Sequence, residues 1–188
     1  MFDKLLRHPG VIEEWELRSR FGFLAIHGGS LERGTAEVAT DAAERGRASL
    51  YAVRQPEDLR WHIPSALVDP GASPALAAFL DHVDTAVSLH GYGRAGFRDT
   101  VLIGGQNREL ATQAAGVLRG ALPSYPVVDD LSVIPPDLRG VHPDNPVNRP
   151  RRTGIQVELP PRLRDGNGAA ADRDALVSAL ASLAASSS

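Results

Sequence analysis

Short apolar runs alternate along the chain with segments whose apolar residues recur at helical spacing. The apolar runs have the length of strands, and each is bounded by glycine, proline or charged residues. They occupy residues 11–17, 21–26, 49–53, 85–89, 100–105 and 155–159. Because strands and helices alternate, the pattern predicts an α/β fold, a three-layer α/β/α sandwich around a mixed, mostly parallel and largely buried sheet.

The helical segments between these runs carry their own start signals. Apolar residues recur at helical spacing in residues 35–46, 73–83 and 107–122. The last two segments begin at Ser73 and Asn107, residue types that often cap the first turn of a helix. A final amphipathic helix is predicted over about 172–185, after an exposed link at 164–171.

The size of the chain predicts a single domain over residues 1–188. A chain of 188 residues with 43% hydrophobic content can form one substantial core and is short for two. Only residues 125–152 break the regular pattern, as a proline-rich stretch with little periodicity. Long irregular connections inside compact domains are often functional, so this loop is a candidate binding element.

Charge and hydropathy exclude several classes of partner. The formal net charge is -3, which gives no general attraction to nucleic acid or to an anionic membrane. The first twenty residues mix charges into every turn and lack the apolar stretch of a signal peptide or a membrane span. We therefore expect a cytoplasmic protein with no nucleic-acid or membrane partner, and the sequence leaves its oligomeric state open.

The chain has no cysteine, so a transition metal would have to be held by histidine and carboxylate. His27 follows the strand predicted at 21–26, and His90 follows the strand predicted at 85–89. Ligands of open α/β sheets bind beyond the carboxyl ends of the strands, which is where both histidines stand. Each is followed by glycine, which would allow a sharp turn and leave the imidazole uncovered.

Two imidazoles and one carboxylate are a common ligand set for catalytic zinc, and His27, Glu32 and His90 would supply it. Bound zinc lowers the pKa of a water molecule and polarises a carbonyl, so amide hydrolysis needs only a nearby general base. Glu158, alone in the apolar strand at 155–159, is the candidate base. Burying a carboxylate there costs free energy unless the group is paired.

Plainer interpretations stand beside this one. A histidine at a strand end is often only a hydrogen-bonded structural residue, and Glu32 could be a solvated turn carboxylate. Glu37 is a rival ligand, although its place in a predicted helix favours a surface role. Glu158 could instead be the buried partner of Arg152 or Arg162.

The remaining histidines are weaker candidates. His62 and His142 could line the site, but each lies beside a proline in a loop, where a hydrogen-bonding role is sufficient. His8 and His82 are expected at the surface.

Six segments in one order carry a family resemblance. They are HGGSLERGT at 27–35, WHIPS at 61–65, LHGY at 89–92, VLIGGQN at 101–107, NPVNR at 145–149 and GIQVELPPRLR at 154–164. Together they resemble the poly-γ-glutamate hydrolase family, zinc enzymes known from phages and bacteria, over about residues 22–164. The resemblance implies a zinc carboxypeptidase-like fold and hydrolysis of γ-glutamyl amide bonds.

The resemblance also implies roles for individual residues. His27, Glu32 and His90 match the family's metal ligands, and Glu158 matches the glutamate that activates water. Four residues separate His27 from Glu32, whereas classical carboxypeptidases use a tighter His-x-x-Glu spacing, which favours the poly-γ-glutamate branch. In the NPVNR segment, two further residues resemble the pair with which related carboxypeptidases hold a substrate carboxylate: Asn148 and Arg149.

An acidic substrate, either a γ-glutamyl polymer or a small γ-glutamyl compound, agrees with a cluster of arginines around Glu158 in the sequence. Such side chains can clamp free carboxylates, although any one of them can simply face solvent. They are Arg149, Arg151, Arg152, Arg162 and Arg164.

Three functions from different classes remain open. The first is a zinc amidohydrolase acting on γ-glutamyl bonds. The second keeps the zinc but acts on N-acyl amino acids or on the γ-linked glutamate of peptidoglycan peptides. The third is a non-catalytic polyanion-binding relative.

Pro64 and Pro146 depart from the family pattern and would reshape the substrate groove rather than the ligand set.

Overall fold

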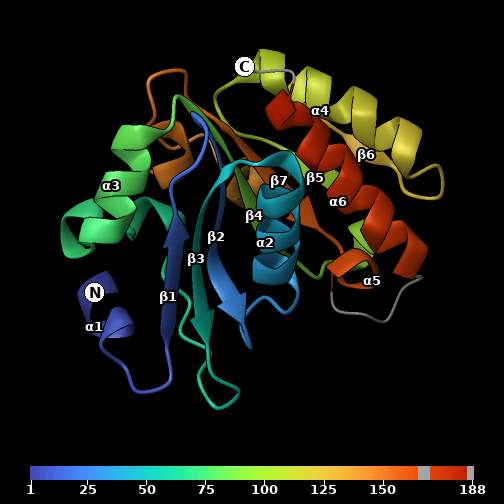
Figure 1. Ribbon diagram of the computed structural model, residues 1–188. Helices are drawn as coiled ribbons and strands as arrows, with labels where there is room; N and C mark the ends of the chain where they lie inside the picture. Colours follow the sequence, from blue (N-terminus) through green and yellow to red (C-terminus); the bar gives the residue numbers. More distant parts are fainter. Residues whose placement is uncertain (165–169, 186–188) are drawn as a thin grey trace.

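The computed structural model describes residues 1–164 and 170–185. Its centre is a seven-stranded sheet with the spatial order β1-β3-β2-β4-β7-β5-β6 (Figure 1). The strands are β1 Ile12–Glu16, β2 Phe21–Gly29, β3 Ser49–Gln55, β4 Thr85–Gly91, β5 Val101–Ile103, β6 Val127–Val128 and β7 Ile155–Leu159.

Four central strands, β3, β2, β4 and β7, run parallel to one another. At one edge β1 is antiparallel to β3, and toward the other edge β5 is antiparallel to β7 while β6 is parallel to β5. The predicted mixed, mostly parallel sheet is confirmed. The carboxyl ends of the four central strands meet at one edge of the sheet, where ligands of such folds bind.

Helices cover both faces of the sheet, so the molecule has the predicted three layers (Figure 1). Helices α2, α4 and α6 pack on one face, and α1 and α3 lie on the other. The helices are α1 Phe2–Leu6, α2 Thr35–Gly46, α3 Pro74–His82, α4 Arg108–Ala121, α5 Pro161–Arg164 and α6 Ala170–Ala185. Short 3-10 helices are η1 Ser65–Leu67, η2 Pro70–Ala72, η3 Ala95–Phe97, η4 Pro136–Leu138 and η5 Pro146–Asn148.

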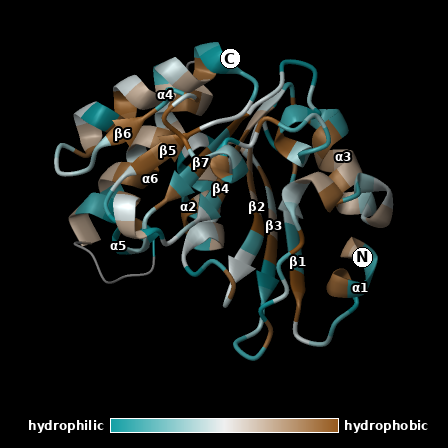
Figure 2. Ribbon diagram, turned by 180° about the vertical axis from the view of Figure 1, so that it is seen from behind, coloured by the Kyte–Doolittle hydropathy of each residue, from teal (hydrophilic) through white to brown (hydrophobic). Residues whose placement is uncertain are grey.

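The alternation of side chains along β2 shows why this strand is apolar throughout. Phe23 and Ala25 pack into the core beneath α2, α4 and α6. Leu24 and Ile26 point to the opposite face and join the core beneath α1 and α3. A strand covered on both faces reads as a continuous hydrophobic run, and the middle of the sheet is correspondingly brown in Figure 2.

The predicted helix starts are confirmed in detail. The Ser73 hydroxyl accepts a hydrogen bond from the Leu76 amide at 2.9 Å, and the Asn107 side chain accepts one from the Leu110 amide at 3.0 Å. The C-terminal helix is present as α6, which is exposed or half-buried over its first residues and mostly buried from Leu176 onward. Most of the link predicted at 164–171 falls in 165–169, outside the described residues.

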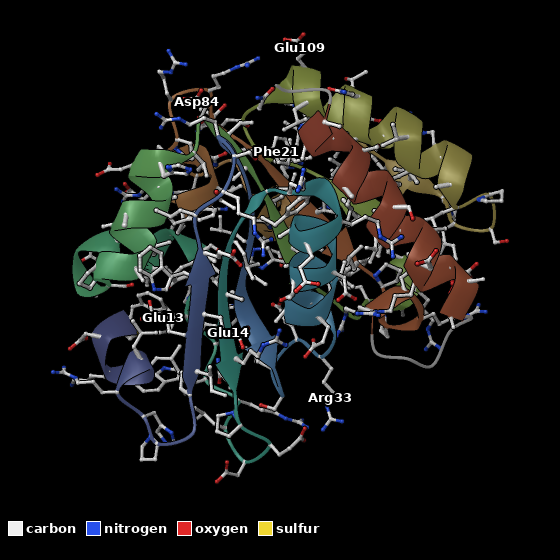
Figure 3. All side chains as sticks on the ribbon, in the orientation of Figure 1. Glu13, Glu14, Phe21, Arg33, Asp84 and Glu109 are labelled. Atoms are coloured by element: carbon white, nitrogen blue, oxygen red, sulfur yellow. The ribbon has the colours of Figure 1, made fainter. Side chains whose placement is uncertain are left out.

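Labelled side chains mark the two ends of the sheet. Figure 3 shows Phe21, Asp84 and Glu109 at one end and Arg33, in the turn after β2, at the other. The turn at Arg33 marks the carboxyl-terminal edge, where the candidate residues lie. Among the helices of the described residues, we find none with the length and apolarity needed to cross a bilayer.

Candidate active site

His27 reaches the site through an irregularity in β2. Strict alternation would place its side chain with Phe23 and Ala25, beneath α2. The pairing of β2 with β3 shifts register between Ala25 and Gly28, so β2 carries one extra residue there. The His27 imidazole instead donates from Nε2 to the carbonyl of Ile63 at 2.8 Å, in the loop after β3.

His90 and Glu158 are cross-strand neighbours, paired in the register of β4 and β7. In β4, Val87 and Leu89 pack into the core beneath α2, α4 and α6, so the His90 side chain points to the opposite face of the sheet. In β7, Val157 packs into that same core, so the Glu158 side chain also points to the opposite face. Both side chains are buried, with exposed fractions of 3% for each residue. Strand alternation therefore delivers a histidine and a carboxyl group to one place.

Glu32 lies between the two histidines. Its Oε1 is 3.0 Å from His27 Nδ1, and its Oε2 is 3.7 Å from His90 Nδ1. The Gly91 amide donates to Oε2 at 2.9 Å. The predicted trio of His27, Glu32 and His90 is thus brought together, with the imidazole rings of the two histidines 5.0 Å apart.

The outer nitrogen of each imidazole is already occupied. His27 Nε2 bonds the Ile63 carbonyl, and His90 Nε2 lies 2.9 Å from the Ser88 hydroxyl. Because a carbonyl only accepts, Nε2 of His27 carries a proton, and in the neutral ring Nδ1 holds a lone pair. Metal-binding histidines usually show this arrangement, with the second nitrogen bonded to a neighbouring oxygen.

The members of the trio shift one another's pKa values. Burial alone would raise the pKa of Glu32, but the positive charge and hydrogen bonds of His27 and His90 outweigh it and hold the pKa well below its usual range. Burial opposes the charged form of His90, yet its hydrogen bond to Glu32 and the charges of Glu32 and Glu158 raise its pKa overall. Glu32 is therefore held as a carboxylate.

Glu158 has the opposite environment. Burial is the largest effect and raises the pKa of Glu158 to about 7, although the charge of His90 lowers it. The Gln156 amide donates to Glu158 Oε1 at 2.8 Å, and Asn145 donates to Gln156 Oε1 at 2.8 Å. Glu158 is therefore oriented by a buried chain of side-chain hydrogen bonds and can exchange a proton near neutral pH.

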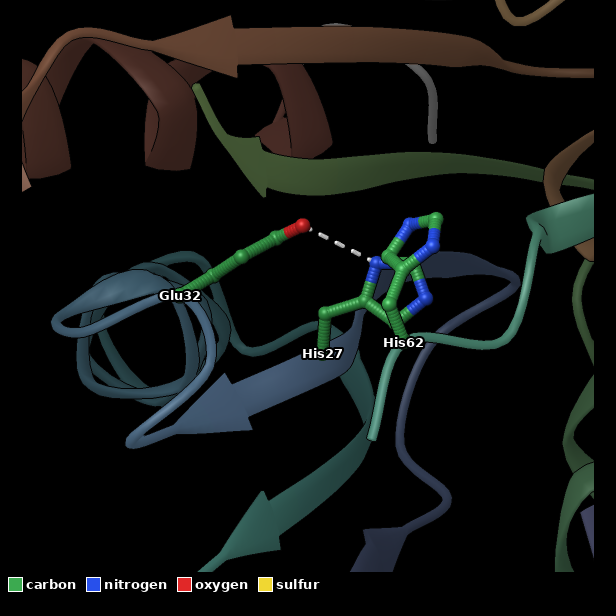
Figure 4. Close-up of side chains that lie close together, drawn as sticks. All are labelled: His27, Glu32 and His62. Atoms are coloured by element: carbon green, nitrogen blue, oxygen red, sulfur yellow. Dashed lines mark hydrogen bonds and ion pairs between the residues drawn. The ribbon is translucent and has the colours of Figure 1, made fainter. Parts of the chain in front are cut away.

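The sequence predicts only a lining role for His62, but in the structure this residue lies beside two of the candidate ligands. Its ring lies 4.8 Å from that of His27, and its ligand atom lies within 4.8 Å of those of His27 and Glu32 (Figure 4). Partial burial and the charge of His27 lower the pKa of His62, which favours a neutral imidazole. The WHIPS segment is the sequence signal for His62, whereas the other two histidines stand out by their position at strand ends.

A cavity of about 770 Å³ opens over these groups. Its wall combines the site residues with apolar side chains from three loops, and no arginine lines it among the described residues. The lining includes His27, Leu31, Glu32, His62, Pro64, Ala66, His90, Leu138, Val141, His142, Asn145, Gln156 and Glu158.

Asn148 and Arg149 lie beside the cavity rather than in its wall. The buried Asn148 amide donates to the carbonyls of Gly140 and His142 at 2.7 and 3.0 Å, and thereby holds the loop that forms one wall. Arg149 forms an ion pair with Asp144 at 3.2 Å. Their predicted binding of a substrate carboxylate stays a prediction.

The other arginines of the predicted cluster also have positions away from the cavity wall. Arg151 pairs with Asp84 at the amino-terminal end of β4, at 3.3 Å. Arg164 donates to the carbonyls of Leu159 and Arg33. Within residues 1–164 and 170–185, Glu158 has no ion pair with Arg152 or Arg162, so the alternative of a buried carboxylate–arginine pair is wrong.

Three further expectations are settled by position. Glu37 lies on the surface of α2 and pairs with Arg54, so it is not a rival ligand. His142 lines the cavity, whereas the His8 and His82 rings contact backbone carbonyls elsewhere.

The glycine after His90 does not provide the expected sharp turn, since Gly91 has no positive φ. A Cβ atom on Gly91 would lie 2.5 Å from Arg164 Nε, so glycine permits a close approach instead. The Gly91 amide can then reach Glu32.

Curated relatives share part of this chain. It is 31% identical over 137 residues to the SPbeta prophage-derived protein YoqZ of Bacillus subtilis, and 28% identical over 137 residues to YndL of the same organism. Each alignment covers 72% of this chain, but only 46% of YoqZ and 50% of YndL. The chain thus spans about half the length of these relatives.

Solved structures share its fold. A bacteriophage poly-gamma-glutamate hydrolase superposes with a TM-score of 0.78 at 23% identity, covering 98% of this chain and 93% of that one. A zinc-free structure of YndL gives 0.76 at 23% identity, over 94% and 90% of the two chains. A metallo-carboxypeptidase from Burkholderia cenocepacia gives 0.51 at 11% identity, over 98% and 66%. These likenesses confirm the carboxypeptidase-like α/β fold.

The family follows from the sequence itself. The family model of the poly-gamma-glutamate hydrolases matches residues 4–172, which is most of the chain and includes every residue of the candidate site. With the fold, the site geometry and this match in agreement, the protein belongs to the poly-gamma-glutamate hydrolase family.

Proposed function

We propose that the protein is a zinc-dependent amidohydrolase that cleaves γ-glutamyl amide bonds. One observation carries the proposal: the Nδ1 atoms of His27 and His90 face the two oxygens of a single buried carboxylate, Glu32. The neutral His27 ring presents a lone pair from Nδ1, because its Nε2 donates to the Ile63 carbonyl, and a lone pair facing a carboxylate requires a positive charge between them. A proton or a metal ion can supply that charge.

The donor set fits zinc. Two imidazole nitrogens and one carboxylate oxygen form the protein part of many catalytic zinc sites. The Ile63 carbonyl and the Ser88 hydroxyl hold the outer nitrogens, so both rings are fixed in the orientation that a metal would need. His62 is a third imidazole, close enough to join the set or replace a member of it. Bound there, zinc would polarise the scissile carbonyl and activate a water molecule.

Glu158 is the proposed general base. Because burial raises its pKa to about 7, both its protonation states are accessible at neutral pH. In the proposed reaction its carboxylate accepts a proton from the attacking water, and the resulting carboxylic acid returns that proton to the leaving amide nitrogen. Gln156 holds Glu158 Oε1 throughout, which leaves the other oxygen for this transfer.

The γ-glutamyl substrate is supported by family membership and by the name of the phage hydrolase that shares the fold. Asn148 and Arg149 remain the proposed residues for a free carboxylate of the substrate, and Arg149 would have to leave Asp144 to take that role. The polymer itself and smaller γ-glutamyl conjugates both satisfy these requirements.

Elemental analysis and a cleavage assay test the proposal together. The purified protein should hold about one zinc per chain and release fragments from poly-γ-glutamate. His90→Ala should lose both the metal and the activity. Glu37→Gln is the matched control, since Glu37 is an exposed helical carboxylate paired with Arg54. A protein that stays free of zinc after incubation with it, or that cleaves no γ-glutamyl bond when loaded, contradicts the proposal.

A second substrate class is favoured by the cavity wall. The cavity has no arginine lining among the described residues, and Leu31, Pro64, Ala66 and Val141 give it apolar surface. Such a wall suits the acyl chain of an N-acyl amino acid. Comparing turnover of N-acyl glutamates with turnover of γ-glutamyl oligomers separates the two classes.

A further inference from the structure

A second cavity, of about 530 Å³, lies beside the one that holds the candidate site. The loop after β4 and the start of α5 form its walls. The residues that matter for its chemistry are Tyr92, Arg94, Phe97, Arg98, Asp99 and Arg162. This cavity is rich in arginine, whereas the wall of the site cavity has none among the described residues.

The two cavities are neighbours. Gly91 lines the site cavity, and the next residue, Tyr92, lines the second. Across the boundary, Arg94 of the second cavity forms an ion pair with Asp137, which lines the site cavity. An extended ligand bound over His90 and Glu158 would therefore continue past Gly91 into the second cavity.

The loop that forms the second cavity is tied down at its centre. The Tyr92 hydroxyl lies 2.6 Å from the carbonyl of Phe97 and 2.5 Å from that of Thr100, so the residues between them curve around the phenol ring. The curve turns Arg94, Phe97 and Arg98 toward a common space.

The arginines differ in what they already bind. Arg94 pairs with Asp137, and Arg162 pairs with Asp99 at 3.3 Å. For the Arg98 guanidinium, residues 1–164 and 170–185 provide no ion pair and no hydrogen bond. Guanidinium groups bind carboxylates with two parallel hydrogen bonds. Arg98 is thus the cation in this cavity that is available to an anionic ligand.

We infer that the second cavity binds the free carboxylate of a glutamyl residue next to the one being cleaved, and that Arg98 is its main contact. The inference rests on the proposed function, because it specifies which substrates the proposed amidohydrolase takes. It explains how the site cavity, which no arginine lines among the described residues, could serve a polyanionic substrate. The second cavity, and not the cavity that holds the reacting bond, would bind the anionic group. The substrate class is then a γ-glutamyl oligomer or polymer.

Substrates of two lengths test the inference. In Arg98→Gln, kcat/KM for long poly-γ-glutamate should fall about tenfold, the loss expected for a charge-assisted hydrogen bond. Turnover of a γ-glutamyl dipeptide, too short to reach the second cavity, should stay unchanged. Activity on the polymer should also become less sensitive to salt. Arg151→Gln is the matched control, because Arg151 pairs with Asp84 at the opposite end of the sheet.

Equal losses on both substrates, or no loss on the polymer, would overturn the inference. Its failure is kept separate from failure of the proposed function by calorimetric titration of the polymer into protein prepared without metal. Arg98→Gln should bind the polymer about tenfold more weakly than the parent protein. Arg98-dependent binding by the metal-free protein, together with no cleavage by the zinc-loaded protein, would contradict the proposed reaction alone, and equal binding by both proteins would contradict the role of Arg98.

Discussion

Two regions that contribute to the candidate site are built differently. His90 and Glu158 lie on β4 and β7, where strand pairing fixes their positions, and His27 lies on β2 at the register shift. The facing loop, residues 129–150, is mostly irregular and is held by side-chain amides such as Asn145 and Asn148. The strands carry two histidines and the proposed base, while the loop shapes the cavity around them. Changes in the two regions should therefore have different consequences.

The largest effect is expected for Glu158→Gln on the strand side. The amide cannot accept a proton from water, so kcat should fall by about 10³-fold, within the range for loss of a general base. Zinc content and the folded state should be retained, as measured by elemental analysis and circular dichroism. Glu109→Gln, at the far end of the molecule in Figure 3, is the control. Full activity of Glu158→Gln would remove the assigned role.

The strand region was predictable because alternation is a local property. Val157 and Leu159 flank Glu158, and Val87 and Leu89 precede His90, so each polar side chain is visible in its sequence as an exception. The position of His27 was predicted, but its orientation depends on the extra residue between Ala25 and Gly28, which no local pattern announces.

The short elements and the loop could not be predicted in the same way. Helices α1 and α5 have five and four residues, little more than one helical turn each, and strand β6 has only two, so none of them shows a period. The contacts of the loop connect residues by side-chain-to-backbone hydrogen bonds, so its shape depends on tertiary packing. For the same reason, the sequence predicted only a lining role for His62, on another loop. It also could not show that the arginines near Glu158 in the sequence lie outside the cavity wall.

The next largest effect is expected on the loop side, for Asn148→Ala. This change removes the donor to the carbonyls of Gly140 and His142 and the acceptor for the Gln106 amide. Because Asn148 is buried, we expect the free energy of unfolding to fall by about 2 kcal/mol. Urea denaturation measures it. Asp144→Asn, which breaks the exposed pair with Arg149 and the 3.9 Å contact with His142, should cost less than about 1 kcal/mol.

Arg149 sharpens the comparison, because its proposed role requires the loop to take part in binding. If Arg149 leaves Asp144 for a substrate carboxylate, Arg149→Ala should raise KM about tenfold with kcat nearly constant. Asp144→Asn should lower KM, since it releases the guanidinium. Steady-state kinetics on a γ-glutamyl oligomer measures both. Unchanged KM values in the two variants would leave the loop with a structural role only.

The smallest effect is expected at Gln156, the residue that joins the two regions. Its amide nitrogen donates to Glu158 on the same strand, while its oxygen accepts from Asn145 in the loop. The bond from Gln156 lowers the pKa of Glu158, opposing the larger effect of burial. In Gln156→Leu the pKa of Glu158 should therefore rise, and fewer molecules hold the carboxylate that acts as base.

The sign of the pH dependence follows directly. Below the pKa of Glu158 the base is protonated and inactive, so a higher pKa moves the acid limb of the kcat/KM profile to higher pH. Near pH 7 we expect a loss of about fivefold that shrinks as the pH rises. Gln106→Leu is the control, since the exposed Gln106 side chain reaches the loop but not Glu158. A loss that is equal at every pH would mean that Gln156 only supports the loop, and that the two regions act independently.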